Sequence, residues 1–148
     1  MFELLQNALS KYNCFDTLEK VSDFDLEYIL KEDPLVPLDY ISFLKEIGWG
    51  ADFSGEMWFF KGVFPSTELS SDDDTEVHRS LSHILFFAYD SSGDQYGFDT
   101  KDNFKIVQVD PSDWEPMDCA DSLQEFLLTH YEDALEEDFS SIKQILLS

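Results

Sequence analysis

Positively charged residues are scarce in this chain. Thirty-two Asp and Glu stand against nine Lys and Arg, Arg79 being the one arginine, and the formal net charge is −23. Proteins that bind nucleic acid neutralise phosphates with concentrated Lys and Arg, so this composition excludes nucleic acid as a ligand. An anionic membrane surface is disfavoured for the same reason. The partners that fit are a cationic protein or a protein whose own ligand is an anion, and solubility alone is the competing explanation of the acidity.

Long apolar runs and cysteines are also scarce. No run approaches the length that spans a bilayer. The first residues, MFELLQNALSKYN, lack the basic region and the small-residue cleavage site of a secretory signal. Cys14 and Cys119 lie far apart in the sequence, which favours two free thiols in a reducing compartment. We therefore expect a cytoplasmic protein.

Motifs for catalysis and metal binding are missing as well. The chain has no nucleophile elbow and no glycine-rich phosphate loop. The turn 90–94 fails the calcium-loop pattern, because Gly93 falls at position four and position twelve is not Glu. The three histidines and two cysteines have no zinc-ligand spacing. We expect a protein without enzymatic activity, metal or cofactor; a hydrolase using two of its many carboxylates is the alternative.

Apolar residues are nevertheless plentiful. They make up 43% of the 148 residues, and 14 of them are Phe. This amount predicts one domain over residues 1–148 with a substantial core.

Helical patterns occupy both ends of the sequence. Apolar spacing predicts a helix near residues 2–12, and Ser22 with Asp25 resembles a capping box before a second helix that ends at 33–34. Pro37 and Gly48 delimit a third helix. Asp121 with Gln124 is predicted to cap a long helix, and residues 139–147 add another. The stripe expected to be buried in the long helix is Leu123, Phe126, Leu127, Tyr131 and Ala134.

Strand patterns occupy the middle of the sequence. Residues 56–64 predict a strand kinked at Gly62, and 105–109 predict another. The polar segment 66–80, with three aspartates at 72–74, is expected to be a loop or a short helix, and 111–116 a linker. Helices, then strands, then helices indicate an α+β fold, with a central, mainly antiparallel sheet flanked by N- and C-terminal helices.

The most informative segment is the hairpin 84–99, ILFFAYDSSGDQYGFD. Its first half is almost continuously apolar, which is typical of a strand covered on both faces. Asp90, Asp94 and Asp99 flank its turn and far end. Because no ligand spacing fits, we interpret these acids as turn residues whose side chains hydrogen-bond the nearby backbone. We expect Asp94 and Asp99 to lie at the edge of a binding face.

Charge is unevenly distributed, and this suggests a surface that faces a partner. No Lys or Arg occurs between Lys105 and Lys143, a span with eleven acids, whereas a surface selected for solubility intersperses both signs. Trp49, between two glycines, is either a core residue or an exposed anchor. The candidate partner-binding residues are Trp49, Asp94, Asp99, Asp113, Glu115, Asp118, Glu125 and Glu132.

The order of these motifs resembles the SUKH superfamily, also described as Smi/Knr-type. The matching pieces are the helix PLDYISFL ending in GWG, the strand MWFF, the hairpin ILFFAYD with GDQYGFD, the strand IVQV and the helix SLQEFL. The resemblance covers about 22–135. It leaves out 136–148 and the acidic insertion around Asp72.

The resemblance implies a fold and a function. It implies an α+β fold in which Gly93, Asp94 and Asp99 are hallmark residues. For a bacterial protein it implies an immunity protein that binds and neutralises a cognate toxin, often a nuclease. Eukaryotic relatives are linked to cell-wall signalling, so a scaffold or regulator that binds a cellular protein is the second hypothesis.

Overall fold

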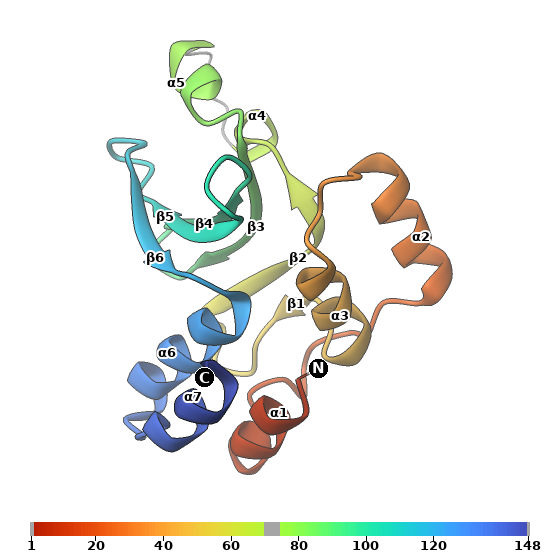
Figure 1. Ribbon diagram of the computed structural model, residues 1–148, viewed down its shortest axis with the longest axis vertical. Helices are drawn as coiled ribbons and strands as arrows, with labels where there is room; N and C mark the ends of the chain where they lie inside the picture. Colours follow the sequence, from red (N-terminus) through yellow and green to blue (C-terminus); the bar gives the residue numbers. More distant parts are fainter. Residues whose placement is uncertain (1, 70–74, 148) are drawn as a thin grey trace.

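A single antiparallel sheet organises the structure. The computed structural model describes residues 2–69 and 75–147. Its strands form a meander in which each one pairs with its sequence neighbours (Figure 1). The fold is therefore α+β, as the sequence predicts. The strands are β1 (Gly50–Ala51), β2 (Met57–Phe64), β3 (Ile84–Asp90), β4 (Gln95–Asp99), β5 (Lys105–Val109) and β6 (Pro116–Ala120).

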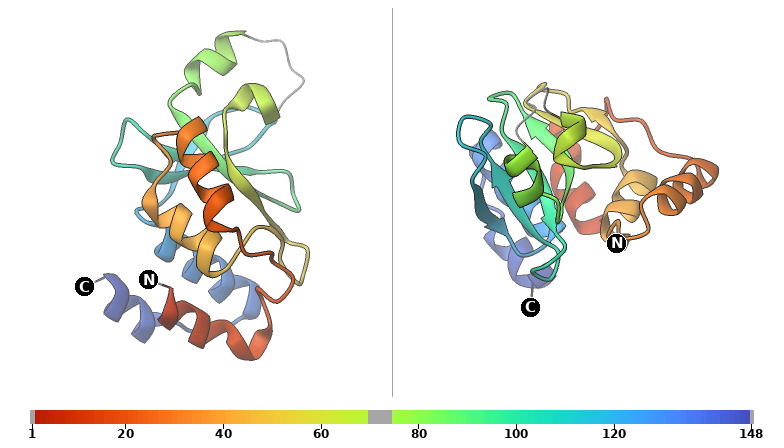
Figure 2. Two further views of the ribbon diagram at one scale, coloured as in Figure 1. Left: turned by 90° about the vertical axis from the view of Figure 1, so that its right-hand side faces the viewer. Right: turned by 90° about the horizontal axis from the view of Figure 1, so that it is seen from above.

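Helices flank the sheet in three groups. α1, α6 and α7 gather at one end, where α1 and α7 lie side by side; α2 and α3 lie beside β2, and α4 and α5 lie at the other end (Figures 1 and 2). The bounds are α1 (Glu3–Leu9), the 3-10 helix η1 (Ser10–Tyr12), α2 (Asp23–Glu32), α3 (Leu38–Glu46), α4 (Ser66–Leu69), α5 (Thr75–Ser80), α6 (Leu123–Leu135) and α7 (Ser140–Leu147).

Both faces of the sheet are covered by apolar side chains. The larger cluster contains Phe87 and Phe98, whose rings stack 4.6 Å apart between centroids. The smaller cluster contains Ile84 and Phe86 from the same strand, β3. Neighbouring β3 residues thus belong to different cores. This explains the continuous apolar run and confirms the predicted hairpin, β3 with β4.

The predicted helix ends hold for α2 and α3. The Ser22 side chain caps α2 by accepting from the Asp25 N–H at 3.2 Å. Pro37 precedes α3, and Gly48 follows it with φ +127° while its N–H donates to the Phe43 carbonyl at 2.9 Å. A Cβ on Gly48 would lie 2.6 Å from the Glu19 backbone, so both conformation and space require glycine here.

The predicted kink in β2 is a bulge. Residues Phe59 and Phe64 pair with Ala88 and Phe86, so β2 has extra residues between them. Gly62 supplies φ +149° within this stretch. The buried Tyr40 hydroxyl contacts the Phe60 carbonyl and lies 3.2 Å from that of Phe87. It therefore satisfies backbone groups where the ladder is interrupted.

Several sequence predictions are wrong in detail. The 111–116 linker leads into a strand, β6, that the prediction omits, because all but the last of its positions are exposed and show no alternation. Ser122, not Asp121, caps α6 by accepting from the Glu125 N–H at 3.1 Å. Ala134 is exposed, and Leu128 is buried in its place. The aspartates at 72–74 lie outside the described residues.

Helix length also bears on membrane insertion. Within 2–69 and 75–147, every helix is too short or too polar to cross a bilayer.

Candidate functional site

Asp90, at the turn of the β3–β4 hairpin, accepts hydrogen bonds from the turn backbone and from a neighbouring side chain. One carboxylate oxygen of Asp90 accepts the N–H groups of Ser92 and Asp94, each at 3.0 Å. Its other oxygen accepts the Tyr96 hydroxyl at 2.8 Å. Asp90 is thereby occupied with local hydrogen bonds, as expected of a turn aspartate.

Asp94 and Asp99 lie at opposite ends of β4. Asp94 accepts from the Gln108 side-chain amide at 2.7 Å. Asp99 accepts from the Lys101 N–H at 3.0 Å and lies 3.6 Å from His83 Nε2. The two carboxylates are therefore not brought together. Among the described residues, no group of three His, Cys, Asp or Glu is arranged to hold a metal ion.

Three predicted acids gather along one edge of the sheet. Asp113, Glu115 and Asp118 are exposed on the segment that enters and forms β6. Lys105 ion-pairs with Asp118 at 2.7 Å and with Asp102 at 2.6 Å. Asp113, Glu115 and Asp118, with the exposed Asp121 before α6 and the exposed Asp133 on α6, form what we call the acidic β6–α6 surface.

Glu125 and Glu132 belong to α6 and have structural partners. Glu125 accepts the Asp121 N–H at 2.9 Å at the helix start. Glu132 accepts the Phe139 N–H at 2.8 Å and pairs with Lys143 at 2.9 Å. These contacts lower the pKa of the Glu132 carboxyl, chiefly through Lys143. Through this hydrogen bond and this ion pair, Glu132 connects α6 to α7 and to the residue before it.

Trp49 lies far from those acids in the sheet order. It is half-buried against the larger core and pairs with Glu19 in an isolated bridge beside β1, at the sheet edge opposite β6. Lys61 Nζ lies 5.8 Å from its ring centroid. The predicted site residues consequently do not form one patch.

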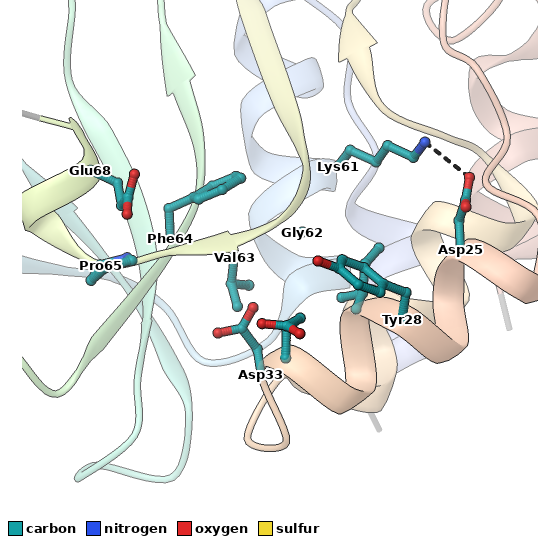
Figure 3. A pocket seen from close by; sticks show the side chains of 11 residues that line it. Asp25, Tyr28, Asp33, Lys61, Gly62, Val63, Phe64, Pro65 and Glu68 are labelled. Carbon is teal, nitrogen blue, oxygen red and sulfur yellow. Dashed lines mark ion pairs between the residues drawn. The ribbon is translucent and has the colours of Figure 1, made fainter.

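A groove between α2 and the end of β2 escaped the sequence analysis. Its volume is about 560 Å³. Tyr28, on α2, and Asp33, the residue after its end, point toward β2, and Val63 points back toward Asp33 (Figure 3). Lys61 crosses to Asp25 in a 3.0 Å ion pair. We call this feature the α2–β2 groove. The sequence feature that relates to it is the predicted kink at Gly62. A kink in a strand does not by itself predict a cavity.

The α2–β2 groove is negatively charged. Glu32, Asp33 and Glu68 line it, and within 2–69 and 75–147 none of the three forms an ion pair with Lys or Arg. Burial, and secondly the charge of Glu32, raises the pKa of the Asp33 carboxyl. Both causes indicate a carboxylate that a nearby cation would stabilise.

A smaller hollow between α6 and the sheet contains Cys119 and His130. Its volume is about 170 Å³. Partial burial, and secondly Glu125, raises the pKa of the Cys119 thiol, while burial lowers the pKa of His130. A nucleophilic Cys–His pair needs the opposite, a thiolate beside an imidazolium. The shifts of Cys119 and His130 thus run opposite to those of a catalytic Cys–His pair.

Comparison with known proteins gives a family and one similar structure. A crystal structure of Atu4351 from Agrobacterium tumefaciens shares 18% identity with the chain at a TM-score of 0.44. The alignment covers 74% of this chain and 46% of that protein, so the chain spans about half the length of the protein it matches. No protein of curated function matches.

The family assignment comes from residues 35–127, which run from the α2–α3 connection into α6. They match the SUKH_6 model, described as SMI1-KNR4 cell-wall. This range contains the whole sheet and more than half of the chain, and it confirms the resemblance seen in the motifs. The chain belongs to the SUKH (SMI1-KNR4) family.

Proposed function

We propose that this SUKH-family chain is an immunity protein that binds and neutralises a cognate bacterial toxin, a basic nuclease, through an acidic surface. The observation that carries the proposal is the excess of acids on the acidic β6–α6 surface, where Lys105 pairs with Asp118 but Asp113, Glu115 and Asp133 are also exposed. Its sequence span has no Lys or Arg between Lys105 and Lys143. Asp113, Glu115 and Asp118 are exposed there.

Electrostatics gives this surface a mechanism. A nuclease is basic where it holds phosphates, so an acidic protein is attracted to that region and occupies it. Binding alone then blocks the substrate. Inhibition of this kind uses no catalytic group on the immunity protein.

The experiment is co-expression with the toxin encoded beside this gene, followed by binding kinetics with a catalytically inactive toxin. We expect growth to be rescued and a direct complex to form. The variant Glu115→Lys, Asp121→Lys, Asp133→Lys should associate at least about tenfold more slowly at low salt, with a weaker salt dependence.

A matched control makes the same change in net charge at another part of the surface. Glu3, Asp16 and Glu19 are exposed acids in the N-terminal part of the chain. Their replacement by lysine changes the net charge equally, so it should slow association much less. Absence of binding to the co-encoded toxin contradicts the proposed function. Equal slowing by both triple variants contradicts the role of the acidic β6–α6 surface.

A second candidate is a scaffold or regulator that binds a cellular protein. The cell-wall description of the family model favours it. A stable endogenous partner, captured from cells that carry no toxin locus, supports this alternative. It uses the same fold without an antitoxin role.

A further inference from the structure

The acidic β6–α6 surface attracts a basic partner through its charge. The α2–β2 groove has negative charge as well, and it also has a concave shape that can hold a side chain. Its volume is about 560 Å³, and its walls come from a helix and a kinked strand. α2 rests on the body through Leu26 and Ile29, which are buried. The groove lies beside this contact, because Ile29 approaches Gly62 where β2 bulges.

Aromatic surface is exposed along the same helix face. Tyr28, in the groove, is 61% exposed, and Phe24, one turn earlier, is 80% exposed. Exposed aromatics of this size are typical of surfaces that bind proteins. Here they lie next to carboxylates, so the groove offers an apolar platform with an anionic rim.

The charge of the groove selects its occupant. Glu32 and Asp33 lie at the end of α2, and Glu68 lines the groove from α4. Lys61, the groove's one lysine, is already engaged by Asp25. A second copy of this chain, with a net charge of −23, is repelled by such a rim. A cationic side chain with an apolar stem matches both the platform and the rim.

We propose that the α2–β2 groove receives a basic, partly apolar segment of the partner protein. An Arg or Lys side chain of that segment lies across the Tyr28 ring and its cation reaches Glu32 and Asp33. The inference rests on the proposed function, since the partner is the toxin, and it adds a specific docking position. α2 precedes the family-matched range 35–127, so half of the groove lies outside the shared part of the fold.

The test uses a probe that does not depend on the toxin. An acetylated, amidated peptide of alternating arginine and leucine is titrated into the full chain labelled with ¹⁵N. We expect amide shift changes to concentrate in α2 and at 61–68. Changes concentrated instead on the acidic β6–α6 surface would overturn the inference.

Two variants and one control sharpen the test. Glu32→Gln with Asp33→Asn should weaken the peptide about tenfold at low salt, and Tyr28→Ala should weaken it at unchanged net charge. Asp16→Asn with Glu3→Gln makes the same charge change away from the groove and should alter affinity less than about twofold. All these positions are at least partly exposed, so folding is retained.

Spermine separates a docking site from general attraction of cations. It carries positive charge without an apolar side chain, so it should bind more weakly than the peptide and be insensitive to Tyr28→Ala. Equal binding of spermine and peptide, with the same shift pattern, would overturn the inference. The peptide result does not depend on the toxin, so failure of toxin binding alone leaves the groove supported and refutes the proposed function only.

Discussion

The hydroxyl of Tyr131 on α6 donates a 2.8 Å hydrogen bond to the carboxylate of Asp52, in the loop between β1 and β2. Asp52 is only 3% exposed. Its other oxygen accepts the Ser54 hydroxyl at 2.9 Å and the Glu56 N–H at 3.2 Å. A buried carboxylate is tolerated only with such partners, so this bond joins α6 to the loop beside β1, at the sheet edge opposite β6.

Removal of the Tyr131 hydroxyl should destabilise the fold. The variant Tyr131→Phe keeps the ring and leaves one Asp52 oxygen unsatisfied, so we expect a loss of about 2 kcal/mol in the free energy of unfolding. Urea denaturation followed by circular dichroism measures it. Tyr96→Phe is the matched control: its hydroxyl also donates to a carboxylate at 2.8 Å, but the partner, Asp90, is half-buried and is rehydrated more easily. A loss from Tyr96→Phe equal to or larger than that from Tyr131→Phe would contradict this explanation.

The Asp52–Tyr131 contact also marks what sequence patterns do and do not reveal. The spacing of apolar residues in α6 predicts that Tyr131 is buried, and the structure confirms it. Its partner lies 79 residues away in an irregular loop, where no periodicity operates. Local signals such as the Ser22 cap and Gly48 were predictable, because their causes lie within a few residues. β6 was not, since an exposed edge strand carries no alternation of apolar residues.

The candidate sites show the same division. The sequence identified the acidic span 106–142, which depends on composition alone. It did not reveal that Trp49 and Asp118 lie at opposite sheet edges, because that follows from the strand order. The α2–β2 groove needs the approach of Ile29 to Gly62, a tertiary contact, to exist.

Two glycines should respond differently to the same substitution. Gly48 and Gly93 both have positive φ, +127° and +91°. A Cβ on Gly93 meets nothing within 4 Å, so Gly93→Ala has only the backbone cost of about 1–2 kcal/mol. At Gly48 the Cβ lies 2.6 Å from the Glu19 backbone, and Gly48→Ala must also displace the Glu19–Trp49 bridge. We expect a loss of at least about 3 kcal/mol by urea denaturation. Similar losses of unfolding free energy in the two variants would show that the backbone shifts and relieves the contact between the new Cβ and Glu19.

The two free cysteines should differ in reactivity. Cys14 is buried and Cys119 is exposed. Burial raises the pKa of both thiols, that of Cys14 to about 11, so the difference in reactivity follows mainly from access. A disulfide-exchange reagent at pH 8 should modify one thiol in the native protein and two in denaturant. Cys119→Ser should abolish the native reaction; persistent labelling of that variant would place Cys14 within reach of solvent.

His130 should make stability depend on pH near neutrality. Burial lowers its pKa below 6.5, against the opposing effect of Asp52, Glu56, Asp90 and Asp133. Between the folded pKa and 6.5 the unfolded chain therefore binds more protons than the folded chain. The free energy of unfolding falls as pH decreases through this window, and the contribution of His130 is fully present above 6.5.

The variant His130→Phe isolates this effect. Nε2 of His130 is buried and has no hydrogen-bond partner among the described residues, so phenylalanine removes the titration without breaking a bond at Nε2. It also keeps an aromatic ring beside Phe126. We expect equal or greater stability than the wild type at pH 7.5. Between pH 7.5 and 5.5, the unfolding free energy of the variant should decrease less than that of the wild type. Urea curves at several pH values within this range measure both quantities. Parallel pH profiles for the two proteins would contradict this prediction. They would mean that the pKa of His130 is the same in the folded and the unfolded chain, because the four carboxylates offset the effect of burial.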